Sequence, residues 1–448
     1  MKLDRTKMTD CLHGNYFDPG IETAPREEIR RIQLEKLRRQ TARVFEQVPW
    51  YRERFRELGV SPEDIRTLED VRHLPFTDKQ VLRDTYPFGL CAIALDDVVR
   101  LHSSSGTTGK AIVIGYSQRD LDVWSDCIAR LAVMVGVTRA DRVQMAFGYG
   151  MFTGGFGLHY GCEKLGCLIV PAGSGNTERH LSMIGDYKTT VLIATPSYAL
   201  HMCEVGESLG FDWAASSMRV GLFGGEPCTP GMKREIERRM HIVCTDNYGL
   251  TEVNGPGVSG ECLYSRDHQH IAEDHFLWEI IDPVTNEPLP EGHEGELVLT
   301  LLDKEAFPML RYRTHDLTRV TTEPCACGRT HARMAKVRAR TDDMLIVRGT
   351  NIFPSQVEDA LVGIQGLAPH YRIVLDNETG MDRFTVMVEL RPDAFSDSFE
   401  QMDHFRHQIV DRLKQALFIT PVVKLLEPGS IERTVGKSKR VEDKRKKS

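Results

Sequence analysis

A loop rich in glycine and hydroxyl side chains has residue types that could do chemistry. It comprises Ser103, Ser104, Ser105, Gly106, Thr107, Thr108, Gly109 and Lys110, and it separates two runs of β-strand composition. Glycine lets the backbone approach a ligand closely, hydroxyls add donors and the lysine adds a positive charge, so the loop could hold a polyphosphate. Its spacing differs from the G-x-x-x-x-G-K-[ST] phosphate loop, and no helix obviously follows it. Many such clusters are plain polar turns, so the loop by itself leaves both interpretations open.

Two thiols separated by one residue suggest a bound metal ion. Cys325 and Cys327 precede a glycine, and thiolates this close can occupy adjacent vertices of a tetrahedral site. Two ligands do not complete such a site. The nearest upstream candidates are Cys262 with either His268 or His270, which would make a Cys₃His set for zinc. The alternative is a pair of free thiols in a loop, beside ordinary surface histidines.

Alternating helical and strand-like segments must position these residues. Residues 27–58 carry apolar side chains at helical spacing among many charged ones, which predicts an amphipathic helix. Further along, short β-rich runs alternate with helical stretches, and this alternation is typical of α/β layers. The runs are residues 111–116, 191–194, 219–223 and 296–301.

The C-terminal part has a different pattern. Residues 372–375 and 384–390 alternate in polarity on either side of a turn-like segment, which predicts a hairpin. Residues 399–417 then place apolar side chains on one helical face. We therefore expect an α/β fold with a large multi-sheet N-terminal domain, residues 1–341, and a small mobile α+β domain, residues 342–448.

Length, charge and cysteine content narrow the class of protein. A chain of 448 residues exceeds what one core usually supports, so two domains are expected. The formal net charge of -7 argues against a nucleic-acid partner, whose phosphates need a basic face. The N-terminus is polar, and no stretch approaches the roughly 20 apolar residues of a membrane span, so we expect a cytoplasmic protein without a membrane partner. The 11 cysteines follow no regular framework, which indicates reduced thiols.

Five segments in a fixed order match a known superfamily. After the glycine-rich loop come YGLTE at residues 248–252, RYRTHD at 311–316, RTDDM at 340–344 and GKSKR at 436–440. Together they resemble the motifs of the adenylate-forming enzymes, which include acyl-CoA synthetases, adenylation domains and luciferases. The resemblance implies ATP and Mg²⁺ as ligands, and a small C-terminal domain that rotates on a large adenylation domain.

The resemblance also implies roles for single residues in the adenylation domain. Thr251 would contact phosphate, and Glu252 would hold Mg²⁺, for which a carboxylate is a suitable hard oxygen ligand. Asp316 would accept hydrogen bonds from both ribose hydroxyls. His315 and Ala339 stand where the family usually has glycine. The sequence therefore does not decide the conformation of the turn that precedes Asp316.

The remaining roles implied by the resemblance lie near the C-terminus. Arg340 would contact the nucleotide, Asp342 would be the hinge of the domain rotation, and Gly349 would line the CoA tunnel. Lys437 would bridge the acid carboxylate and the α-phosphate, whereas Lys439 would be a bystander.

Within the superfamily the chain resembles the phenylacetate-CoA ligases over nearly its whole length. The supporting segments are YGMFTGG at 149–155, TPSYAL at 195–200, FGGEP at 223–227, EDHF at 273–276 and NIFPSQVE at 351–358. By this resemblance, the residues that flank the adenine are Glu226, Pro227, Asn247 and Tyr248. Those near the ring of the acid are Tyr149, Phe152 and Gly225.

Two of these assignments have alternatives. Tyr149 and Phe152 could be core aromatics, and Gly225 stands where the family often has alanine, which would enlarge the pocket slightly. Some members of the family carry a structural zinc whose histidine precedes the EDHF segment, and this favours His270 as the partner of the cysteines. The implied zinc ligands are Cys262, His270, Cys325 and Cys327.

The implied activity is ATP-dependent ligation of an aryl acid to CoA through an acyl-adenylate, which releases pyrophosphate and then AMP. An arylacetic acid is the expected substrate, and relatives suggest a homodimer. Three alternatives remain: AMP transfer to a deazaflavin coenzyme, delivery of the acyl group to a carrier-protein thiol, and a catalytically silent zinc-containing binding protein. The joint presence of Lys437, Glu252, Asp316 and Asp342 argues against the last.

Overall fold

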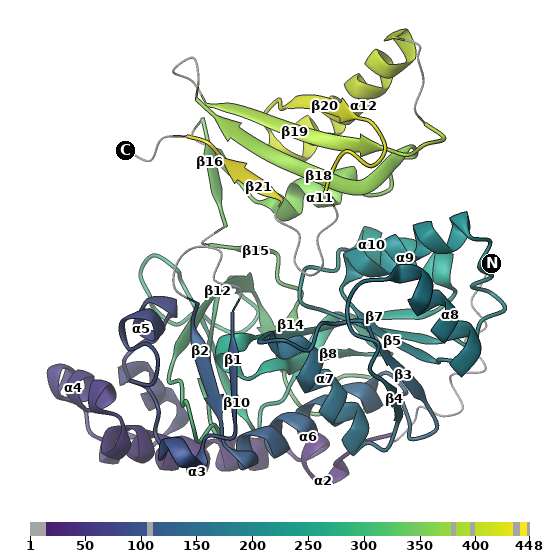
Figure 1. The fold of residues 1–448 in the computed structure, drawn as a ribbon. Coiled ribbons are helices and arrows are strands. Elements are labelled where there is room, and N and C mark those ends of the chain that lie inside the picture. The colour runs from purple at the N-terminus through teal and green to yellow at the C-terminus, as the bar shows by residue number, and fades with distance from the viewer. Residues whose placement is uncertain are drawn as a thin grey trace. The chain divides into compact units, whose positions relative to one another are not determined.

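The chain divides into two compact units (Figure 1). The computed structural model describes residues 15–104, 111–341, 343–348, 350–377, 382–394, 399–432 and 440–445. The first unit comprises Met1–Ala194, Ser216–Gly225 and Thr245–Val337, and the second comprises Thr195–Ala215, Glu226–Cys244 and Arg338–Ser448. The second unit thus holds more than the segment assigned to a lid from the sequence, and the boundary after residue 341 stays a prediction. The layered helices and sheets confirm the α/β class.

Helices open the first unit, namely α2 (Pro19–Glu22), α3 (Arg26–Gln47) and α4 (Pro49–Leu58). The single helix predicted over residues 27–58 is therefore two helices. They separate at Val48, whose extended backbone has φ −112° and ψ 108°. Proline disfavours the helical conformation of the residue before it and has no N–H to continue the helical hydrogen bonds, so the second helix starts at the proline. Short helices follow: η1 (Pro62–Asp64), η2 (Leu68–His73), α5 (Lys79–Asp84) and η3 (Leu95–Asp97).

One part of the largest sheet is parallel. It consists of β3 (Arg142–Met145), β4 (Leu168–Val170), β5 (Val191–Ala194) and β6 (Val220–Phe223). All residues of β5 and β6 are buried, as expected for parallel strands covered on both faces. The predicted runs 191–194 and 219–223 are confirmed as strands.

The other part of this sheet is largely antiparallel. Its strands are β7 (Val243–Leu250), β8 (Gly255–Cys262), β9 (Ser265–Ile271), β13 (Val320–Thr321) and β14 (Arg333–Ala335). Within the described residues, nine strands form the sheet in the order β13-β14-β9-β8-β7-β6-β5-β3-β4. Two segments far apart in the sequence, 268–270 and 333–335, are thereby paired.

Helices α6 (Gln118–Met134), α7 (Thr153–Lys164) and α8 (Thr177–Tyr187) belong to the first unit. Helices α6 and α7 pack so closely that a Cβ on Gly157 would lie 2.2 Å from the Trp124 ring. Two smaller antiparallel sheets complete this unit. They are formed by β1 (Arg100–Ser103) with β2 (Val113–Tyr116), and by β11 (Gly295–Leu301) between β10 (Phe276–Ile281) and β12 (Tyr312–Thr318).

The second unit contains α9 (Pro196–Ser208), α10 (Pro230–Met240) and the C-terminal elements. These are β15 (Ala339–Arg340), β16 (Leu345–Val347), β17 (Thr350–Ile352), α11 (Pro354–Leu361), β18 (Leu367–Asp376), β19 (Arg383–Leu390), α12 (Phe399–Leu417), β20 (Val422–Leu426) and β21 (Val441–Asp443). Antiparallel pairing of β18 with β19 confirms the predicted hairpin. None of the described helices combines the length and the apolar character needed to cross a bilayer.

Candidate active site and metal centre

The glycine-rich loop separates two β-strands, as the sequence indicated, and the structure pairs these strands, β1 and β2, antiparallel. Ser103 ends β1 and donates its N–H to the Met151 carbonyl at 2.9 Å, and the Ser104 N–H reaches the Ile112 carbonyl at 3.3 Å. These contacts fix the start of the loop. The other predicted phosphate-loop residues lie outside the described residues, namely Ser105, Gly106, Thr107, Thr108, Gly109 and Lys110.

The turn η4 (Thr251–Val253) follows directly on β7 and carries two predicted catalytic residues. The Glu252 residue is only 4% exposed, and the nearest cation is the Lys79 ammonium, 3.8 Å from its Oε1. The Thr251 hydroxyl lies 3.4 Å from the hydroxyl of Thr153, the first residue of α7. A buried carboxylate whose one cation among the described residues is this far away is suited to bind a hard divalent ion.

Tyr248 and Asp316 meet although 68 residues separate them. The Tyr248 hydroxyl donates to one carboxylate oxygen of Asp316 at 2.5 Å, and the Asp316 N–H reaches the Thr314 hydroxyl at 3.1 Å. His315, the residue that replaces the usual glycine, has a φ of 62°. Left-handed backbone favours glycine. The turn before Asp316, which the sequence left undecided, therefore has a conformation typical of glycine although a histidine occupies it.

Asn247 and the FGGEP segment form the next part of the site. The Asn247 amide donates to the Phe223 carbonyl at 2.6 Å. A Cβ on Gly224 would lie 2.9 Å from that same amide nitrogen, so the segment needs glycine there. Gly225 adopts a φ of 83°. An alanine at this position would be strained, so glycine is favoured here by the backbone conformation as well as by the room that it leaves in the expected acid pocket.

The two aromatic residues predicted to be near the acid follow β3. The Tyr149 hydroxyl lies 2.9 Å from His159 Nδ1, and its ring packs edge-on against Phe156 with centroids 5.3 Å apart. Burial raises the pKa of Tyr149 and lowers that of His159. Phe152 precedes α7 and is 36% exposed. Neither aromatic is fully buried. Sequence reasoning missed His159, which no local motif marks.

The remaining predicted residues belong to the second unit. Glu226 accepts a hydrogen bond from the Ser197 N–H at 2.7 Å, and Pro227 follows it. Arg340 lies 3.5 Å from Asp343. The hinge residue Asp342, the tunnel residue Gly349 and the catalytic Lys437 lie outside the described residues, so their roles stay predictions.

The candidate metal centre lies in the first unit. The ligand atoms of Cys262, His270, Cys325 and Cys327 all lie within 4.8 Å of one another, and all four residues are buried. The Cys262 and Cys325 sulfurs are 3.7 Å apart, and the Cys327 sulfur is 3.4 Å from His270 Nε2. Tetrahedral zinc with Zn–S bonds of about 2.3 Å would place two sulfurs about 3.8 Å apart, so the spacing fits the ion.

Neighbouring groups orient these ligands. The His270 Nδ1 lies 3.4 Å from the His331 carbonyl, which directs Nε2 towards the cysteines. The Ser265 N–H donates to the Cys262 sulfur at 3.2 Å. Hydrogen bonding from Cys262 holds the pKa of the Cys325 thiol well below its usual range. His268, the other histidine considered, is not one of the four clustered residues.

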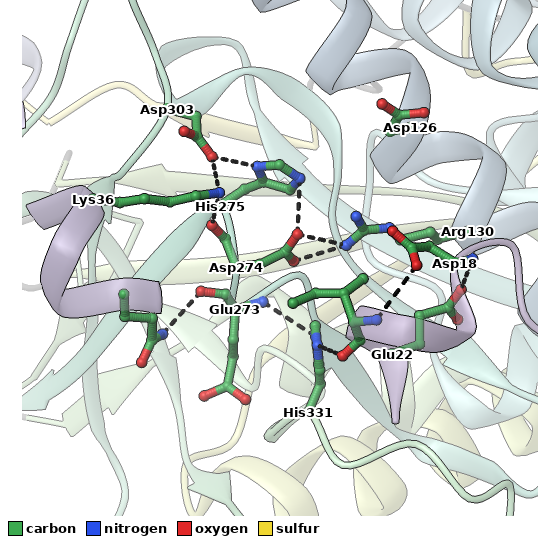
Figure 2. Close-up of polar contacts among 12 residues, drawn as sticks. Asp18, Glu22, Lys36, Asp126, Arg130, Glu273, Asp274, His275, Asp303 and His331 are labelled. Carbon is green, nitrogen blue, oxygen red and sulfur yellow. Dashed lines mark hydrogen bonds and ion pairs between the residues drawn. The ribbon is translucent and has the colours of Figure 1, made fainter. Parts of the chain in front are cut away.

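The first unit also contains a buried ionic network that sequence reasoning missed (Figure 2). Asp274 accepts from Arg130 of α6 at 2.7 and 2.9 Å, and His275 reaches Asp303 at 2.7 Å through Nδ1. Lys36 of α3 also donates to Asp303. The network connects α3 and α6 to the EDHF segment, residues 273–276. In the sequence this segment indicated only a family resemblance.

Comparisons with known proteins place the chain in a family. The family model described as AMP-binding enzyme matches residues 35–300, and the AMP-binding enzyme C-terminal domain matches residues 349–445. A phenylacetate-coenzyme A ligase of Aromatoleum evansii is 46% identical over 95% of this chain and 97% of its own length. That of Escherichia coli is 44% identical over 96% and 98%. The solved 2-hydroxyisobutyryl-CoA ligase in its postadenylation state has a TM-score of 0.90 at 28% identity, over 96% of this chain and 92% of that one.

Both parts of the sequence thus match the same class of enzyme, and the curated relatives match from end to end. The chain belongs to the AMP-binding enzymes and, within them, to the phenylacetate-coenzyme A ligase family, as an ATP-dependent enzyme that ligates an aryl acid to CoA through an acyl-adenylate.

Proposed function

We propose that the substrate of this ligase is an arylacetic acid and that Glu252, Asp316 and Lys437 carry its adenylation. The observation that supports this most is the pairing at the end of β7. The Tyr248 hydroxyl donates to a carboxylate oxygen of Asp316 at 2.5 Å, and Glu252 follows Tyr248 four residues later as a buried carboxylate. One strand end therefore offers groups for both the ribose and the phosphates of ATP.

The first half-reaction makes the acid reactive. A carboxylate is a poor electrophile, so one of its oxygens attacks the α-phosphorus and pyrophosphate leaves, which gives a mixed anhydride. Catalysis consists of positioning and of neutralising charge on the phosphates. Glu252 would hold Mg²⁺, which supplies positive charge there, and the Lys437 ammonium would lie between the carboxylate and the α-phosphate. Thr251 and the glycine-rich loop would bind the departing pyrophosphate.

The second half-reaction is attack of the CoA thiol on the acyl carbon, with AMP as leaving group. It needs Lys437 withdrawn and room for the thiol beside Gly349. A rotation about Asp342 would achieve both changes, so the two-domain organisation is part of the proposed mechanism.

The arylacetic acid is proposed from the relatives and from the aromatic residues after β3. The curated relatives bear the name phenylacetate-coenzyme A ligase. Tyr149 and Phe152 are both partly exposed, so their rings can contact a ligand, and Tyr149 is oriented by His159. An aromatic ring of the substrate would pack against such side chains in an offset or edge-on manner.

The metal in the cysteine cluster is proposed to be a structural zinc ion. The site offers four protein ligands, which leaves no open position for a substrate or a catalytic water. Removing the ion with a chelator is expected to lower the thermal midpoint while ATP–pyrophosphate exchange persists below that midpoint. The expected homodimer is a separate proposal, which light scattering on the purified chain would test.

The experiment that tests the proposed function is AMP release with and without CoA. The panel contains arylacetic, benzoic, indolic and short aliphatic acids. We expect CoA-dependent release concentrated on an arylacetic acid. The proposal would be contradicted if AMP release did not depend on CoA, or if no acid gave AMP release. Either result would favour a deazaflavin or a carrier-protein thiol as the acceptor.

A matched pair of variants tests the role of Lys437. Lys437→Ala should lower adenylation at least about a hundredfold, since it removes a charge at the reacting phosphate, and should spare thioester formation from supplied acyl-adenylate. Lys439→Ala removes a charge two residues away and should change neither half-reaction. Equal loss of both half-reactions in Lys437→Ala would contradict the assignment.

A further inference from the structure

A buried lysine lies next to the turn that carries the proposed magnesium ligand. Lys304 follows β11 and is 4% exposed. Its ammonium donates to Asn254 Oδ1 at 3.1 Å and lies 3.1 Å from the centroid of the Tyr116 ring. The nearest carboxylate oxygen is that of Asp120, at 3.9 Å. The Lys304 ammonium thus contacts one hydrogen-bond acceptor, one aromatic face and one carboxylate, and all three are favourable partners for a cation.

Asn254 is the residue that ends the turn η4. It is buried and adopts a φ of 109°, a conformation that residues other than glycine seldom occupy. Such a backbone persists only when its surroundings hold it. Among the described residues, the Asn254 side chain is held by its hydrogen bond from Lys304, and Glu252 is only two residues away.

The segment around Lys304 is itself fixed from both sides. Asp303 accepts from Lys36 and His275, as Figure 2 shows, and the Glu305 N–H donates to Asp120 at 2.7 Å. The lysine therefore extends from a rigid base towards the turn. Burial lowers the pKa of Lys304 to about 7, with Asp120 opposing the shift. An apolar residue would avoid this cost, so the amino group is expected to have a use.

We propose that Lys304 is a positioning residue for adenylation: through Asn254 it holds the turn in which Thr251 and Glu252 meet the phosphates and Mg²⁺. The proposal rests on the roles proposed for those two residues. It assigns Lys304 no contact with the substrate, and it predicts that loss of the amino group affects the Mg²⁺-dependent half-reaction in particular.

The test measures ATP–pyrophosphate exchange over a series of Mg²⁺ concentrations with full-length wild-type and Lys304→Met proteins. Methionine has a similar shape but no donor for Asn254. We expect the Mg²⁺ concentration for half-maximal exchange to rise about tenfold, the effect of one lost charge-assisted hydrogen bond. Thioester formation from supplied acyl-adenylate and CoA should stay within about twofold of wild type, because it does not use the magnesium site.

Two further variants separate positioning from a general loss of stability. Asn254→Gly tolerates the positive φ and removes the same hydrogen bond, so it should reproduce the rise, and the double variant should show no larger effect than either single one. Lys36→Met weakens the support of Asp303 without touching Asn254. It should lower the thermal midpoint and leave the Mg²⁺ dependence unchanged.

A wild-type Mg²⁺ dependence in Lys304→Met or in Asn254→Gly would overturn the proposal. So would additive effects in the double variant, or the same rise in Lys36→Met. Calorimetric titration of each protein with ATP at low and high Mg²⁺ gives a readout independent of turnover. If the wild type catalyses no exchange with any acid, the proposed function fails, and the inference about Lys304 is still decided by whether Lys304→Met weakens Mg²⁺-dependent ATP binding.

Discussion

Two groups of buried carboxylates in the first unit differ in the cations around them. In the ionic network of Figure 2, Asp274 pairs with Arg130 at 2.7 Å and with His275 at 3.1 Å, and Asp303 pairs with His275 and Lys36. Arg39 also pairs with Asp303, at 3.0 Å. At the end of β7, Glu252 is equally buried, but its nearest cation lies 3.8 Å away. A carboxylate whose oxygens are all engaged stabilises the fold, whereas one with a single distant cation can take up a ligand.

The backbones of the two groups differ as well. The described residues with left-handed backbone include Asn254, His315 and Gly225 around the proposed nucleotide site, but none of the carboxylates and cations of the network. Strain of this kind is often found where function fixes a geometry that packing alone would not choose. The comparison predicts that substitutions in the network change stability, and that substitutions at the turn change catalysis.

The largest expected effect on stability is that of Asp274→Asn. Burial alone would raise the pKa of Asp274, but His275 and Arg130 hold it below its ordinary range, so the group is charged and fully engaged. Its replacement leaves the buried Arg130 uncompensated and should destabilise the first unit by about 3 kcal/mol, measured as a shift of its urea transition.

Asp126→Asn is the matched control for this change. Asp126 is on the same helix α6 and pairs with Lys164 at 2.6 Å, but both side chains are partly exposed. Its loss should cost less than about 1 kcal/mol. Equal shifts in the two variants would mean that burial does not distinguish the network.

Glu252→Gln should behave in the opposite way. The amide keeps the shape of the side chain but loses the charge for Mg²⁺, so ATP–pyrophosphate exchange should fall at least about a hundredfold. Because Lys79, 3.8 Å away, is the one cation that pairs with Glu252 among the described residues, the urea transition should move by less than about 1 kcal/mol. A large loss of stability with exchange intact would reverse the comparison.

The ionic network also predicts a pH dependence of stability. Burial alone would raise the pKa of Asp303, but the hydrogen bond and charge of His275, together with Lys36, lower it to about 2. A depressed carboxyl pKa stabilises the fold above the ordinary pKa near 3.8 and loses that contribution as the pH falls towards 2. The stability advantage of wild type over Asp303→Asn should therefore shrink by about 2 kcal/mol between pH 5 and pH 2, measured by urea unfolding at each pH. A constant difference would show that Asp303 is not charged in the fold.

The two groups of carboxylates were not equally visible in the sequence. Thr251, Glu252 and Asp316 lie in short motifs whose residue order is diagnostic, and the spacing of Cys325 and Cys327 indicated a metal site before any contact was known. The network has no such local pattern. Asp303 and Lys36 are 267 residues apart, and a single sequence does not reveal which distant cation a buried carboxylate will meet.

Local backbone effects were only partly predictable. The break between α3 and α4 could have been foreseen from Pro49, since a proline often starts a helix and disfavours helical geometry before it. The strain at His315 was indicated by the missing glycine, but its φ of 62° is known only from the structure. The partner of Tyr149, His159, depends on a loop after β3 that periodicity does not describe.

The smallest expected effect concerns the strain beside Asp316. His315→Gly should stabilise the first unit relative to His315→Ala by about 1 kcal/mol, because alanine keeps the Cβ that disfavours a φ of 62° and glycine does not. Both variants lose the same contact, between the imidazole and Glu296 at 3.5 Å, so this contact cancels in the comparison. The KM for ATP should stay within about twofold in the glycine variant, since Tyr248 still fixes Asp316. Urea unfolding and initial rates measure both quantities. If the two variants were equally stable, the left-handed backbone would carry no strain, and the contrast between the nucleotide site and the network would rest on the carboxylates alone.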